Sequence, residues 1–96
     1  MTPFEWGLPK AAANLREHGI DFYEAATVFG DPLALVIPDP EHSFGEERLV
    51  IIGISNRNRV LLVSHVERGA AIRIISARRA RPHKRKDYEE GRLWRG

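Results

Sequence analysis

The sequence contains no cysteine among its 96 residues. This absence excludes disulfide bonds, thiolate catalysis and cysteine-ligated zinc, and it agrees with a reducing cytoplasm. Long apolar runs are also missing, because residues 49–54 and 60–63 fall far short of the roughly 20 residues that span a bilayer. Met1 is followed by no basic and then apolar leader. We therefore expect a cytoplasmic protein that does not associate with membranes.

Positive charge is scarce in the first half of the chain. Residues 1–47 contain 2 basic and 9 acidic side chains, whereas residues 48–96 contain 13 basic and 4 acidic ones. The net charge of +2 therefore hides two halves of −7 and +9. Such a chain can offer a polyanion one surface and a cationic partner another. Its length predicts a single domain over residues 1–96, with residues 92–96 as a frayed tail.

Helix signals dominate the first third of the chain. Pro9 suits a first helical position, residues 10–18 are rich in good helix formers, and Gly19 can end the helix in a left-handed conformation. Asp21 and Glu24 have the spacing of a capping box, in which each side chain satisfies a backbone N–H of the other residue. The pattern predicts two short helices, over residues 10–18 and 21–29.

The period then changes to that of strands. Runs rich in Val, Ile and Leu predict strands, and short turns favour antiparallel hairpins; the four runs are residues 33–37, 48–55, 59–67 and 71–79. Residues 3–6 fit an edge strand or an ordered tail, and residues 39–47 a solvated loop. A last helix is predicted over residues 83–90, ended by Gly91. We expect an α+β fold, with an antiparallel meander of about four strands and the helices on one side of it.

The densest positive charge lies in the last predicted strand and just beyond it. Seven cations fall within fourteen residues: Arg73, Arg78, Arg79, Arg81, Lys84, Arg85 and Lys86. Strand alternation predicts one face with Ile72, Ile74, Ser76 and Arg78. The other face would then hold Arg73, Ile75 and Ala77. Arginines placed among isoleucines favour polyanion binding over a merely solvated surface, because a guanidinium stays charged and binds phosphate through two hydrogen bonds.

Groups that could transfer protons are few. His65 is a candidate, since histidine alone has an ordinary pKa near neutrality; a packing role in its strand fits its position equally well. Tyr88 leaves the same two alternatives open. Lys10, nearly alone as a cation in the acidic half, is either an arm that reaches the basic strands or, more simply, a solvated helix residue. The histidine spacings predict no metal site, and the scattered glycines predict no nucleotide cofactor.

Several motifs resemble those of the BrnT toxins of bacterial type II toxin–antitoxin systems. They are Phe4-Glu5-Trp6, the HGI-F-EA pattern over residues 18–25 and the run RIISAR over residues 73–78, and the resemblance extends to about Gly91. It implies a RelE-like fold and a small metal-independent endoribonuclease, without cofactors, that cuts RNA and so halts translation. It also implies neutralisation by a cognate BrnA antitoxin, in an expected heterotetramer that contacts operator DNA only through the antitoxin.

The resemblance also assigns roles to residues of this chain. Arg48 and Arg78 would stabilise phosphorane charge, Arg73 and Lys10 would position phosphate, and Ser76 would support the site. Candidate RNA contacts outside that set are Arg79, Arg81, Lys84, Arg85 and Lys86.

Two positions depart from the family pattern. Gly7 stands where an aspartate is usual, and Lys84 where a glutamate is usual. These departures raise an alternative, a catalytically weakened module that binds nucleic acid or the antitoxin and acts in operon autoregulation. A further alternative is a plain interaction domain whose charged halves pair with a partner.

Overall fold

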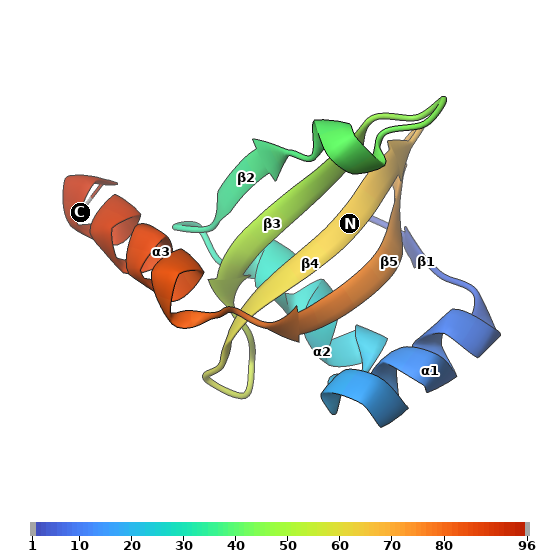
Figure 1. The fold of residues 1–96 in the computed structure, drawn as a ribbon, viewed down its shortest axis with the longest axis horizontal. Helices are drawn as coiled ribbons and strands as arrows, with labels where there is room; N and C mark the ends of the chain where they lie inside the picture. Colours follow the sequence, from blue (N-terminus) through green and yellow to red (C-terminus); the bar gives the residue numbers. More distant parts are fainter. Residues whose placement is uncertain (1, 96) are drawn as a thin grey trace.

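The computed structural model describes residues 2–95 and shows an α+β fold (Figure 1). Within that part of the chain the elements are β1 (Phe4–Glu5), α1 (Leu8–His18), α2 (Phe22–Thr27), the 3-10 helix η1 (Val28–Gly30), β2 (Leu35–Pro38), the 3-10 helix η2 (Pro40–His42), β3 (Arg48–Ile54), β4 (Val60–Arg68), β5 (Ala71–Arg79) and α3 (Pro82–Arg95). The predicted α+β class is confirmed. None of these helices is long and apolar enough to cross a membrane.

The described chain forms a five-stranded mixed sheet in the order β1-β5-β4-β3-β2. Strands β2 to β5 make the predicted antiparallel meander. The prediction of about four antiparallel strands is corrected by β1, which pairs in parallel with β5 at Ile72 and Arg73. Phe4 on β1 packs against Phe29, with ring centroids 5.2 Å apart. A two-residue strand held by such long-range contacts is too short to show a sequence period.

Helices cover both faces of the sheet, so the prediction that they lie on one side is wrong for α3. Helices α1 and α2 pack on the helix face, whose strand residues are Ile51, Leu61, Val63, Ile74 and Ala77. Tyr88 of α3 packs on the opposite face, which we call the open face, against Val50, Ile52 and Leu62. The reason is that β3 and β4 are apolar at consecutive positions. Both of their faces therefore need cover from water.

The ends of the first two helices follow the predicted signals in part. Gly19 adopts a left-handed conformation (φ 69°), and its N–H donates to the Leu15 carbonyl at 2.9 Å. The Asp21 carboxylate accepts the Glu24 N–H at 2.7 Å. The capping box is only half formed, however, because the Glu24 side chain bonds Arg59 and Ser55 instead.

The last helix is longer than predicted. Gly91 does not end α3, which continues to Arg95, so residues 92–95 are helical and not a frayed tail; Gly96 lies outside the described residues. A Cβ at Gly91 would lie 3.1 Å from a methyl carbon of Leu35. The glycine therefore permits close packing of α3 on β2.

An irregularity in β5 changes which side chains share a face. Ser76 pairs with Ser64 and Ile74 with His65, which leaves Ile75 without a partner across β4. The prediction that Ile74 shares a face with Ser76 and Arg78 is wrong, because Ile74 is buried in the core of the helix face. A bulge inserts one residue into the alternation, and the sequence pattern alone does not reveal it.

Candidate functional site

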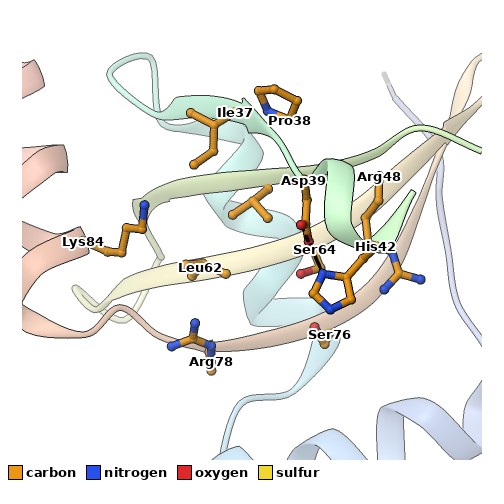
Figure 2. Close-up of a pocket in the computed structure, with 11 residues that line it drawn as sticks. Ile37, Pro38, Asp39, His42, Arg48, Leu62, Ser64, Ser76, Arg78 and Lys84 are labelled. Carbon is orange, nitrogen blue, oxygen red and sulfur yellow. Dashed lines mark hydrogen bonds and ion pairs between the residues drawn. The ribbon is translucent and has the colours of Figure 1, made fainter. Parts of the chain in front are cut away.

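A pocket of about 460 Å³ lies on the open face of the sheet. Strands β2 to β5, the turn that contains η2 and the start of α3 all contribute to its walls (Figure 2). It is lined by Ile37, Pro38, Asp39, His42, Arg48, Val50, Leu62, Ser64, Ser76, Arg78 and Lys84.

Four of the candidate residues from the sequence meet in this pocket. Arg48 comes from β3, Ser76 and Arg78 from β5, and Lys84 from the first turn of α3. Strand β4 separates β3 from β5 and places Ser64 directly opposite Ser76. The bulge at Ile75 is what turns Ser76 and Arg78 toward the pocket while Ile74 and Ala77 stay in the core.

The pocket is positively charged and its cations lack carboxylate partners. Among the described residues, Arg48, Arg78 and Lys84 take part in no ion pair. The Nε atom of Arg48 is buried and has no hydrogen-bond partner within the same part of the chain. A buried N–H without an acceptor is costly. An anion in the pocket would supply acceptors, and phosphate oxygens match the planar guanidinium fork.

Two pocket residues, Asp39 and His42, were missed by the sequence analysis. The Nδ1 atom of His42 lies 2.9 Å and 3.1 Å from the two carboxylate oxygens of Asp39 (Figure 2). The sequence assigned them to a solvated loop. The available signal was their spacing of three residues around Pro40, which begins the 3-10 turn η2 and brings the two side chains to one side.

The other three catalytic candidates lie outside the pocket. Lys10 is exposed on α1, and Arg73 lies beside β1 with its Nη1 atom 3.9 Å from a Glu5 carboxylate oxygen. His65 is buried on the helix face, with its ring centroid 4.8 Å from that of Phe29 and its Nδ1 3.3 Å from the Val63 carbonyl oxygen. Burial lowers the pKa of His65, which favours the neutral ring of a packing residue.

The basic cluster of the last strand and helix divides in space. Arg79 and Arg85 line a second pocket, of about 300 Å³, and Arg81 is exposed. Arg85 and Lys86 pair with glutamates one helical turn later, at 2.9 Å and 3.8 Å. Only Arg78 and Lys84 of the seven cations line the first pocket. No group of three or more His, Asp or Glu side chains in the described chain lies in a metal-holding arrangement.

Fold and pocket together define a small α+β protein with a pocket lined by Arg48, Arg78 and Lys84 on one face of a mixed sheet. Residues 6–84 match the family model described as a ribonuclease toxin, BrnT, of type II toxin–antitoxin systems. The chain is also similar to the crystal structure of the Brucella abortus ribonuclease toxin BrnT. That similarity has a TM-score of 0.67 and 27% identity, and covers 84% of this chain and 99% of that one.

A search of curated proteins finds no match by sequence. The family model nevertheless spans most of the chain, and the structural similarity agrees with it. The chain therefore belongs to the BrnT family of ribonuclease toxins, as the motif resemblance predicted.

Proposed function

We propose that the pocket on the open face cuts RNA without a metal ion, by attack of a ribose 2′-OH on the adjacent phosphorus. The observation that carries this proposal is the convergence of Arg48, Arg78 and Lys84 without ion-pair partners in the described chain. Negative charge grows on the phosphorane oxygens in this reaction, and fixed cations stabilise it. The products are a 2′,3′-cyclic phosphate and a free 5′-OH.

Each candidate takes a role according to its place. Arg48 and Arg78 stabilise the phosphorane, Lys84 holds a phosphate oxygen, and Ser76 supports the site beside Ser64. His65 has no part in this proposal, because it is buried on the helix face. Flanking phosphates are positioned by cations outside the pocket, which are Lys10, Arg73, Arg79, Arg81, Arg85 and Lys86.

The partner proposed for the chain is a BrnA-type antitoxin, in a heterotetramer that reaches operator DNA through the antitoxin. Its support is the toxin–antitoxin family and the exposed apolar side chains on the edge strand β2 and in the turn that follows η2. Val36 and Ile37 on the edge strand β2 are 54% and 36% exposed, and Phe44 beyond η2 is 85% exposed. An antitoxin seated there would cover Ile37, which lines the pocket. Saturating antitoxin should raise the melting temperature, and an unchanged value would contradict this partner.

RNA cleavage in excess EDTA tests the enzymatic proposal. The purified chain should cut a long single-stranded RNA at discrete sites and leave 2′,3′-cyclic phosphate ends. In the cytoplasm, the same cleavage would halt translation. Arg78→Ala should lose roughly 100-fold or more in rate. Arg16→Ala, which removes an exposed arginine of α1, should keep the wild-type rate. Equal loss in both variants would contradict the assignment of the pocket.

If the chain binds RNA without cutting it, the alternative is favoured, which is a module that binds nucleic acid and has no catalytic activity. A 2′-O-methyl RNA separates the two functions, since it lacks the attacking hydroxyl but keeps every phosphate. Its affinity should fall steeply with salt, because each neutralised phosphate releases counterions. A flat salt response would contradict a phosphate-binding pocket under either function.

A further inference from the structure

The pocket contains a pair of side chains able to move a proton. Guanidinium groups do not give up their protons at neutral pH, so Arg48 and Arg78 supply charge but no base. His42 is the one histidine that lines the pocket within the described chain. His65 is buried on the helix face, and His18 and His83 lie on α1 and α3 outside the pocket walls.

The contact with Asp39 fixes which nitrogen of His42 carries the proton. An ionised carboxylate only accepts hydrogen bonds, so the Nδ1 atom at 2.9 Å from it is the donor. The neutral ring then has a free lone pair on Nε2, which can accept a proton. The His42 side chain is 59% exposed, so a substrate can approach the ring.

The turn that holds this pair is tied to the strand that carries Arg48. The Asp39 N–H donates to the Arg48 carbonyl at 2.9 Å. The Ser43 hydroxyl donates to the Asp39 carbonyl at 2.8 Å and accepts the Arg48 N–H at 2.9 Å. Asp39, His42 and Arg48 are thus held in one hydrogen-bonded unit. Such preorganisation is what a proton acceptor beside a phosphate-binding group requires.

We propose that His42 is the general base of RNA cleavage and that Asp39 is its positioning residue. This inference rests on the proposed function and deepens it. Nε2 of His42 takes the proton from the ribose 2′-OH as the 2′ oxygen bonds phosphorus and the bond from phosphorus to the 5′ oxygen breaks. The 5′ oxygen takes a proton from water, and the imidazolium returns its proton to the hydroxide that remains. The charged groups around His42 in the pocket are Asp39, Arg48, Arg78 and Lys84.

Substitution of His42 should separate catalysis from binding. His42→Ala should cut RNA about 100-fold more slowly or worse, in line with the contribution of general acid–base catalysis. Its affinity for 2′-O-methyl RNA should match that of the wild type, because the three cations remain. His83→Ala is the matched control, since it removes an exposed histidine of the basic segment that does not line the pocket. It should cut at the wild-type rate.

Added imidazole gives the inference a readout that a structural role would not move. Free imidazole should restore part of the cleavage rate to His42→Ala and none to Arg78→Ala. Asp39→Asn should lower kcat by about tenfold while KM stays near the wild-type value, because a misoriented base slows the chemical step alone.

The outcomes distinguish this inference from the proposed function. If the wild type cuts, Arg78→Ala does not, and His42→Ala cuts like the wild type, then the ribonuclease pocket stands and His42 is not its base. A His42→Ala variant that fails to respond to imidazole and loses affinity for 2′-O-methyl RNA also contradicts the inference. If the wild type leaves RNA intact, both proposals fail.

Discussion

The two faces of the sheet differ in whether their buried polar groups have hydrogen-bond partners. On the helix face, buried Asn14 donates to the carbonyls of Ile20 and Ala77 and accepts the Ala77 N–H, all within 3.0 Å. Buried Glu24 there bonds Arg59 and Ser55. On the open face, Arg48 keeps a buried Nε without a partner among the described residues. Polar groups that are satisfied stabilise the fold, whereas the buried Nε of Arg48 and pocket cations without ion pairs in the described chain are suited to bind a ligand.

Two arginines make the contrast concrete. Arg59 pairs with a carboxylate that is 2% exposed, so its charge contributes to folding. Arg78 has no carboxylate partner in the described chain and lines the pocket, so its charge is available to an anion. Substitution of an ion-paired residue such as Arg59 should affect stability. Substitution of a pocket residue such as Arg78 should affect activity.

The largest stability effect is expected at Arg59. Arg59→Ala leaves Glu24 buried without its partner, which should lower the free energy of unfolding by about 3 kcal/mol. Urea denaturation measures this value, and the folded fraction of the variant should still cut RNA at the wild-type rate. Arg57→Ala is the control, because Arg57 is exposed in the adjacent turn. A loss of cleavage in the folded fraction of Arg59→Ala would contradict the claim that this residue affects stability alone.

The same ion pair should make the fold sensitive to acid. The hydrogen bond from Arg59 outweighs the effect of burial and, together with that from Ser55, holds the pKa of Glu24 below its ordinary value. Glu24 therefore contributes stability that is complete above its unfolded-state pKa of about 4.3 and is lost as pH falls through the lower folded-state pKa. Urea midpoints at several acidic pH values should fall more steeply for the wild type than for Glu24→Gln. Parallel curves would contradict the stabilising role of the charge.

Asn14 should come next in size. Asn14→Ala leaves two buried carbonyls and the Ala77 N–H without partners, which should cost about 2 kcal/mol. The test compares its melting temperature with that of Arg16→Ala, an exposed substitution two residues along α1. A variant as stable as this control would mean that water replaces the amide, and that the helix face is less tightly closed than described.

A smaller effect is expected at His65. Its pKa is lowered by burial, so the unfolded state binds a proton more readily than the folded state. Stability is complete above the ordinary histidine pKa of about 6.5 and falls as pH decreases toward the lower folded-state pKa. His65→Leu should remove the part of the pH dependence of stability that begins below the ordinary histidine pKa. This variant should cut RNA at the wild-type rate at neutral pH. A variant that folds but does not cut RNA would show that His65 takes part in catalysis.

The smallest effect is a gain at Gly7. This residue is the N-cap of α1 and provides no side-chain hydrogen bond, and a Cβ there would lie 3.5 Å from an Arg73 nitrogen. Gly7→Asp should stabilise the fold by about 0.5 kcal/mol through a cap and a charge beside Arg73. Gly7→Asn separates the cap from the charge. A lower melting temperature for Gly7→Asp than for the wild type would contradict this placement.

Local signals in the sequence predicted the elements well, and long-range contacts account for the errors. Gly19 and Asp21 act through neighbouring backbone groups, so their roles were readable from a few residues. Strand β1 and the bulge at Ile75 depend on pairing with other strands, which no local period encodes. Glu24 failed to complete its capping box because Arg59, 35 residues later, competes for its carboxylate.

The candidate site was predictable where motifs carried it. Arg48, Ser76 and Arg78 came from the family resemblance, and the structure brings them together across three strands. Strand alternation alone would have grouped Arg78 with Ile74. Asp39 and His42 were not predicted, because a polar turn shows no sequence period. Their proximity to Arg48 also depends on the hairpin between β2 and β3.

The most direct test of the account maps where RNA binds. Backbone amide NMR shifts of the labelled chain should be followed during titration with a short 2′-O-methyl RNA, which cannot be cut. We predict that perturbations cluster on the open face, at Arg48, Ser64, Ser76, Arg78 and Lys84, and that they are lost in Arg78→Ala. Perturbations centred on α1 and α2, with the open face unchanged, would contradict it.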